Sequence, residues 1–95
     1  MKVSSINAAE AATITLNLIA YIASDDDRLE RFIGLSGISL ADLQSGAANP
    51  EFQGFVLEYA LQDESLIIDF AAFSGLKPES LQRARFALPG ATYDS

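Results

Sequence analysis

Residues 21–38, YIASDDDRLERFIGLSGI, recur 38 positions later as residues 59–76, YALQDESLIIDFAAFSGL. The alignment pairs identical residues, both inside these stretches and just beyond them: Tyr21/Tyr59, Asp25/Asp63, Phe32/Phe70, Ser36/Ser74, Gly37/Gly75, Leu43/Leu81 and Gln44/Gln82. A repeat of this kind indicates that one small structural unit is used twice and that both copies share one core.

The repeated unit is predicted to be helical, because acidic residues and glycines mark helix ends in both copies. Asp25 and Asp63 stand where a side-chain oxygen can accept the free N–H groups of a helix start. Gly37 and Gly75 stand where a left-handed residue closes a helix. No alternating strand pattern or hairpin turn competes with this interpretation. With the start signals at Asn7 and Asn49, the pattern predicts helices over residues 8–23, 26–36, 39–46, 64–74 and 78–88, and another that begins at Pro50.

Apolar spacing predicts which side of each helix is buried. In the helix that begins at Pro50, the expected stripe consists of Phe52, Phe55, Val56, Tyr59 and Ala60. In the helix over 64–74, the expected buried face consists of Leu66, Ile67, Phe70, Ala71 and Phe73. We also expect Leu35 to lie on the buried side of its helix, and Leu16 to belong to a central helix that is apolar on nearly every face.

These elements predict an all-α fold: a compact six-helix domain built from two pseudo-symmetric three-helix units, with a repeat offset of 38 residues. A chain of 95 residues suits one domain over 1–95, with an ordered core over about 6–90 and a short polar tail over 91–95. We expect the first and fourth helices to pack at the centre. The pairs 26–36/39–46 and 64–74/78–88 should lie outside them, because short connections make consecutive helices neighbours.

Composition excludes several functions. The chain contains no cysteine and no histidine, so it lacks thiolate chemistry, the commonest general base and the commonest metal ligand. No residue is predicted to be catalytic, and we expect neither an enzyme nor a cofactor. The absence of cysteine fits a reducing compartment, and we expect a cytoplasmic protein. The net charge of −7 repels polyanions at long range.

The most apolar run of the chain is too short to cross a membrane. Residues 14–23 include Thr15 and Asn17, whereas a spanning helix needs about 20 apolar residues. Lys2 precedes this run as in a secretory signal, but Glu10 interrupts the pattern and no A-x-A cleavage site follows. We therefore expect neither a membrane span nor a signal peptide.

The run Asp25, Asp26 and Asp27 is the densest cluster of charge. A calcium loop spaces its oxygen ligands over about twelve residues and has a central glycine and a final glutamate. Here the acidic residues are contiguous and Arg28 follows directly. Helix capping explains the run, so we predict no metal site.

The segment over 70–85 resembles the helix-turn-helix family of DNA-binding proteins. Ala71, Gly75 and Leu81 have the spacing of that motif, with a small residue, a glycine four positions later and an aliphatic residue six positions after the glycine. The resemblance implies a reading helix whose nucleic-acid contacts are Lys77, Gln82, Arg83 and Arg85. Any helix that is closed by glycine and followed by a second helix produces the same spacing.

Three ordered segments carry a second resemblance, which covers almost the whole chain. They are I-A-S-D-D-D-R-L-E-R-F-I-G-L-S-G-I (22–38), N-P-E-F (49–52) and G-L-K-P-E-S-L-Q-R-A-R-F-A-L-P-G (75–90). The chain is similar to a bacterial family catalogued as a domain of unknown function, number 3572. Its members share the acidic junction, the F-x-x-x-x-G helix end and the closing A-L-P. The resemblance implies a short, cytoplasmic, stand-alone helical protein with no assigned activity and no catalytic residues to transfer.

Three functions stay open at this point. The leading hypothesis is a protein-protein interaction or regulatory module that lacks catalytic activity and binds an unknown protein partner. The second is a helix-turn-helix DNA-binding protein that uses residues 70–85, although the charge balance leads us to expect no nucleic acid. The third is a small-ligand carrier, because six phenylalanines and three tyrosines are available to line a cavity. The sequence does not indicate an oligomeric state.

Overall fold

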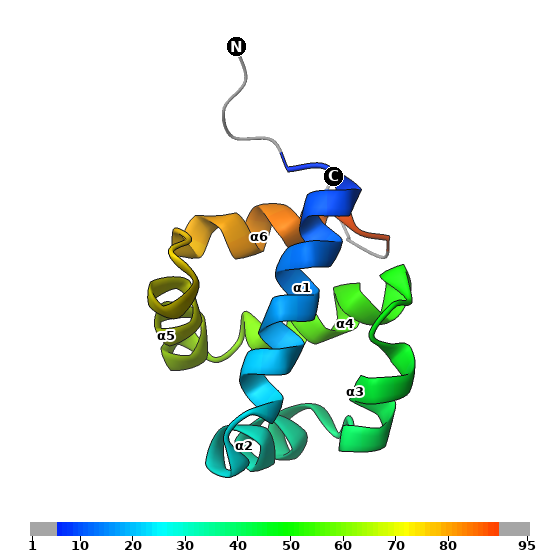
Figure 1. Ribbon diagram of the computed structural model, residues 1–95, viewed down its shortest axis with the longest axis vertical. Coiled ribbons are helices and arrows are strands. Elements are labelled where there is room, and N and C mark those ends of the chain that lie inside the picture. Colours follow the sequence, from blue (N-terminus) through cyan, green and yellow to red (C-terminus); the bar gives the residue numbers. More distant parts are fainter. Residues whose placement is uncertain (1–5, 90–95) are drawn as a thin grey trace.

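The longest of the described helices, α1 (Ala8–Ala23), runs along the length of the molecule, and the other helices surround it (Figure 1). This computed structural model describes residues 6–89, and each regular element in that range is an α-helix. After α1 follow α2 (Asp26–Ser36), α3 (Leu40–Gly46), α4 (Pro50–Ala60), α5 (Glu64–Ser74) and α6 (Pro78–Ala87). The predicted all-α class is confirmed. The predicted polar tail over 91–95 lies outside the described residues.

The core forms where α1, α4 and α6 meet. Helix α6 packs against both α1 and α4, and α1 and α4 also contact each other, whereas α2 packs against the end of α1 that α6 leaves free (Figure 1). The side chains with no exposed surface in this core include Leu18, Ile22, Val56, Leu57 and Leu81. None of the helices within residues 6–89 is long and apolar enough to cross a membrane.

The helix starts are capped by the predicted side chains. The Asn7 side chain accepts a hydrogen bond from the Glu10 backbone N–H at 2.8 Å, and the Glu10 carboxylate accepts one from the Asn7 N–H, which completes a capping box. The Asp25 carboxylate accepts from the Arg28 N–H at 3.0 Å. The Asp63 carboxylate likewise accepts from the Leu66 N–H at 3.3 Å. The predicted role of the acidic junctions in capping is thus confirmed.

The two predicted helix-closing glycines are left-handed. Gly37 has φ 75° and Gly75 has φ 77°, and these are the positive φ angles found within residues 6–89. In each case the glycine N–H donates to the carbonyl of the residue four positions earlier, Ile33 for Gly37 and Ala71 for Gly75. A side chain with a Cβ is disfavoured at such angles, which explains why glycine ends both helices.

The repeat is clear in these local features, but the environments of its two copies differ. Phe32 and Phe70 are both buried, in keeping with their matched positions. However, α6 packs across α1 and α4, whereas its counterpart α3 contacts the other helices less extensively. Superposition of two pseudo-symmetric three-helix units therefore stays a prediction.

Four side chains that we expected to be buried are instead exposed, namely Leu16, Leu35, Phe55 and Phe73. The buried face of α4 is formed by Gln53, Gly54, Val56, Leu57 and Ala60, so that helix is rotated away from the predicted stripe. Gly54 explains the rotation. A Cβ at this position would lie only 2.9 Å from the carbonyl oxygen of Pro89. The small residue lets the end of α6 approach α4, and this contact turns Phe55 toward solvent.

We expect Gly37→Ala and Gly75→Ala each to destabilise the protein by about 1 kcal/mol or more, because alanine is strained at positive φ. For a domain of this size, that loss lowers the midpoint of thermal unfolding by about 5 °C. Gly34 provides a matched control, since it is exposed within α2 and an added Cβ would meet no atom within 4 Å. Gly34→Ala should raise the midpoint, because alanine favours a helix interior. Unchanged midpoints for both cap variants would contradict this account of the helix ends.

Candidate functional site

Helices α5 and α6 have the local geometry that the helix-turn-helix spacing predicts. Ala71 and Leu81 are buried, and Gly75 between them is left-handed. The Leu76 N–H donates to the Ala71 carbonyl at 2.9 Å, which closes α5 before Lys77 begins the next helix. The same geometry follows from the glycine cap alone, so the position of the basic side chains decides what this segment can bind.

Three of the four residues predicted to contact nucleic acid are exposed. Lys77 caps α6 without a side-chain hydrogen bond, and Gln82 and Arg83 lie on the solvent side of the helix. The same side of α6 also presents Glu79 and Phe86, both exposed. A carboxylate and a phenyl ring beside the one arginine make this face poorly suited to phosphate contacts.

The fourth predicted residue, Arg85, is engaged within the protein. Its side chain is only 11% exposed, and its Nε donates to a carboxylate oxygen of Glu58 at 2.6 Å. A second nitrogen donates to the Pro89 carbonyl at 3.3 Å. The guanidinium fills the space beside Gly54, where an added Cβ would lie 3.0 Å from Nη1. The structure therefore places Arg85 between α4 and α6 and separates it from Lys77, Gln82 and Arg83.

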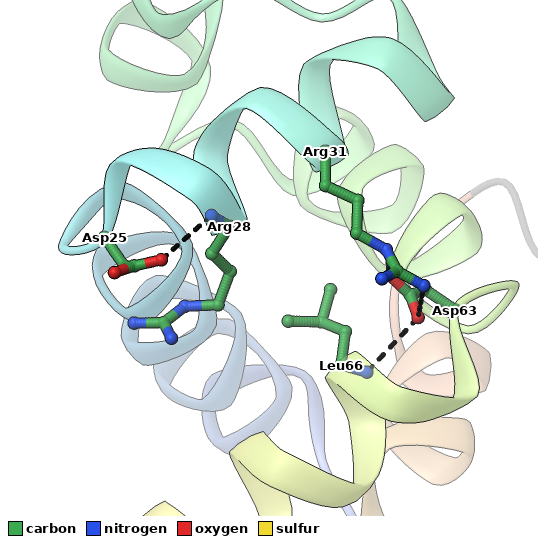
Figure 2. Close-up of polar contacts among 5 residues, drawn as sticks. All are labelled: Asp25, Arg28, Arg31, Asp63 and Leu66. Atoms are coloured by element: carbon green, nitrogen blue, oxygen red, sulfur yellow. Dashed lines mark hydrogen bonds and ion pairs between the residues drawn. The ribbon is translucent and has the colours of Figure 1, made fainter.

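Asp25 before α2 and Asp63 before α5 line the same open depression, and Figure 2 shows them on opposite sides of Arg28 and Leu66. Asp63 is nearly buried. One oxygen of its carboxylate lies 2.8 Å from Nε of Arg31, and the other accepts a hydrogen bond from a second nitrogen of the same guanidinium at 3.0 Å. This bidentate pair joins α2 to the start of α5. Among the residues that the structure describes, no group of three or more acidic side chains is arranged to hold a metal ion.

An aromatic stack joins α1, α2 and α5, and the sequence analysis did not predict it. The Arg28 guanidinium lies 3.7 Å from the centre of the Tyr21 ring, and its Nε donates to the Tyr21 carbonyl at 2.9 Å. The Tyr21 ring also lies 4.9 Å from the ring of Phe73 and 5.4 Å from that of Phe70. Phe70 is buried, whereas Phe73 is 73% exposed. The stack thus fixes the position of a phenyl ring that remains open to solvent.

Helix α5 is apolar on its core side and on both flanks, and its solvent side also carries the exposed polar residues Ser65 and Asp69. Leu66, Ile67, Phe70 and Ala71 face the core, whereas Ile68, Ala72 and Phe73 are exposed. Phe73 lies on the flank next to α1, where it contacts Tyr21. Ile68 lies on the flank next to α6, where it lines a depression together with Pro78. We call Ile68, Ala72 and Phe73 the outer face of α5. The signal for it in the sequence was the near absence of polar residues between Leu66 and Phe73.

Open depressions lie on either side of α5. The depression between α5 and α6 has a volume of about 560 Å³ and is lined by Leu61, Gln62, Glu64, Ile67, Ile68, Pro78, Glu79 and Gln82. A second depression of about 240 Å³ lies between α2 and α5, next to the Arg31–Asp63 pair. Both open to the surface, and neither is an enclosed chamber in the core.

One comparison with known proteins gives a match. The family described as "Protein of unknown function (DUF3572)" matches residues 8–91, which is nearly the whole chain. No curated protein and no solved structure gives a significant match. The similarity to the family thus extends over all six helices, including the α5–α6 segment and both acidic junctions.

We expect Arg85→Ala to destabilise the protein by about 1–2 kcal/mol, because the variant loses the Glu58 pair and the packing of the guanidinium between α4 and α6. Arg83→Ala is the matched control on the same helix. It should change stability by less than about 0.5 kcal/mol, because Arg83 is exposed and has no side-chain partner within residues 6–89. Urea unfolding measures both values. Equal stability of the two variants would refute a structural role for Arg85.

Proposed function

The chain belongs to the DUF3572 family of proteins of unknown function, and we propose that it is a protein-binding module that acts without catalysis. The binding surface in this proposal is the outer face of α5, formed by Ile68, Ala72 and Phe73. The partner is a protein that covers this face and removes its apolar side chains from water.

The observation that carries the proposal is the position of an apolar helix at the edge of the molecule (Figure 1). A surface helix normally has polar residues on most of its solvent side. Between Leu66 and Phe73, Asp69 is the one polar residue of α5, yet only one side of the helix packs against the core. Isolated exposed apolar residues are common, but several of them on one short helix are typical of an interaction surface.

The rigidity of Phe73 also supports this proposal. Its ring is exposed but rests against Tyr21, which in turn is held by the Arg28 guanidinium. Binding a partner to a side chain that is already fixed costs less conformational entropy than binding to a mobile one. Phenylalanine is among the residues enriched at the core of protein interfaces.

The composition supports a role without catalysis. The chain has no histidine and no cysteine, so the usual general base and thiol nucleophile are missing from the sequence. The absence of cysteine also supports a location in the reducing cytoplasm, which we include in the proposal.

A DNA-binding function is supported less well. The exposed side of α6 offers Arg83 and Lys77, but Glu79 and Phe86 lie beside them and Arg85 is paired with Glu58. A ligand-carrier function is also less well supported, because the depressions next to α5 are open, whereas small-molecule sites bury most of the ligand surface.

Substitutions on the outer face of α5 should abolish partner binding without unfolding the protein. We expect tagged wild-type protein to enrich a defined set of proteins from cells of its source, and Phe73→Ser to lose them. Phe55→Ser is the matched control, because Phe55 on α4 is also largely exposed, at 58%, and its ring stacks on Tyr59 of the same helix. Quantitative mass spectrometry of the captured proteins measures the difference, and thermal melts confirm that both variants fold. If the Phe73→Ser variant captures the same proteins as wild type, the proposal that the outer face of α5 is the binding surface is refuted.

We further expect no useful affinity for duplex DNA at physiological salt. The net charge of −7 and the few free cations near α6 predict a dissociation constant weaker than about 1 µM at about 150 mM salt. Fluorescence anisotropy with labelled duplexes tests this value. Tighter binding that weakens on Arg83→Ala would replace the protein-binding proposal with the helix-turn-helix one.

A further inference from the structure

The depression between α5 and α6 has an apolar floor. Ile67 is almost fully buried there, Leu61 and Ile68 are partly exposed, and Pro78 closes the side formed by α6. Its volume of about 560 Å³ accommodates a few side chains of a partner. The depression shares Ile68 with the outer face of α5, so a partner that covers that face also reaches this floor.

The charged residues that line this floor are both acidic. Glu64 at the start of α5 and Glu79 at the start of α6 line the depression, and no lysine or arginine lines it. Neither carboxylate has a hydrogen-bond or ion-pair partner within residues 6–89. Two carboxylates beside an apolar floor form a surface that is complementary to a cation next to an apolar side chain.

From this arrangement we infer that the α5–α6 depression binds a segment of the partner protein in which a large apolar side chain is flanked by lysine or arginine. The apolar side chain would pack against Ile67 and Ile68, and the flanking cations would pair with Glu64 and Glu79. This inference rests on the proposed binding function and adds the chemistry of the partner.

The neighbouring depression between α2 and α5 lacks this complementarity. Arg28 and Arg31 line it together with its aspartates, and Asp63 already forms a bidentate pair with Arg31. Its Asp63 carboxylate is thus neutralised within the protein, whereas Glu64 and Glu79 form no ion pair within residues 6–89. In the α5–α6 depression, apolar burial supplies most of the affinity, and the two glutamates select the charge of the partner and speed its approach.

The test uses a random peptide library displayed on phage and the full chain immobilised as bait. We expect the selected peptides to share a lysine or arginine next to leucine, isoleucine, phenylalanine, methionine or tryptophan. A synthetic peptide of the consensus sequence, labelled with a fluorophore, then serves as the probe for dissociation constants by anisotropy.

Two variants separate the apolar and the charged contributions. Ile68→Ser should raise the dissociation constant of the probe by about tenfold, because an apolar contact is lost. The double variant Glu64→Gln/Glu79→Gln should also raise the dissociation constant of the probe by about tenfold at low salt. The difference in dissociation constant from wild type should shrink at about 0.5 M salt. Glu30→Gln/Glu51→Gln is the matched control, since it has the same net charge but changes two exposed carboxylates outside the depression. The control should bind the probe as tightly as wild type.

Each outcome decides between the two proposals. Either of two results overturns the inference about charge. The selected peptides are acidic or uncharged, or they are basic but bind the Glu64→Gln/Glu79→Gln variant as tightly as wild type. If such peptides still lose affinity on Phe73→Ser or Ile68→Ser, the outer face of α5 remains a binding surface and only the inferred partner chemistry falls. If no peptide is selected and no captured protein depends on Phe73, both proposals fall.

Discussion

The burial of α1 by α4 and α6 is the packing on which the rest of this structure depends. Leu18 and Ile22 of α1 have no exposed surface, and neither do Val56 of α4 and Leu81 of α6. These three helices are far apart in the sequence, so their contacts close the chain into one core. Gly54 is essential to that closure, because only a residue without a side chain lets the α6 end, with Arg85 and Pro89, approach α4. Helices α2, α3 and α5 are then held at the edges through short, tightly capped connections.

The capping residues and the closing glycines could be predicted from the sequence because their causes are local. A carboxylate at Asp25 or Asp63 meets the free N–H groups of its own helix, and the left-handed angle at Gly37 or Gly75 depends on a few neighbouring residues. The six helices followed from these signals, and the predicted bounds agree with the structure to within one residue, although the end of α4 was not predicted. The superposition of the two repeat units is a tertiary property, and it remains a prediction.

The buried faces and the candidate site could be predicted only in part, because they depend on contacts between distant helices. The stripe of α4 indicated burial of Phe55, but the approach of α6 at Gly54 turns that ring outward. Likewise, the helix-turn-helix resemblance implied a nucleic-acid contact at Arg85, but Glu58, twenty-seven residues away, holds its guanidinium. The exposure of Phe73 depends on where α1 places Tyr21. Spacing along one helix contains no information about any of these partners.

The exposed apolar side chains on the outer face of α5 are unfavourable for the stability of the isolated domain. Residues such as Phe73 and Ile68 leave apolar surface in water, and serine or glutamate at the same positions would serve an isolated domain better. The core does not need them, since Leu66, Ile67 and Phe70 already supply the buried side of the helix. Moreover, the glutamates that border the α5–α6 depression form no ion pair within residues 6–89. Exposed apolar side chains and carboxylates that form no ion pair within residues 6–89 lie next to each other on this helix pair. A single partner segment with a basic and an apolar side chain would cover the apolar residues and pair with the carboxylates. For this reason we assign the binding surface to α5 and α6.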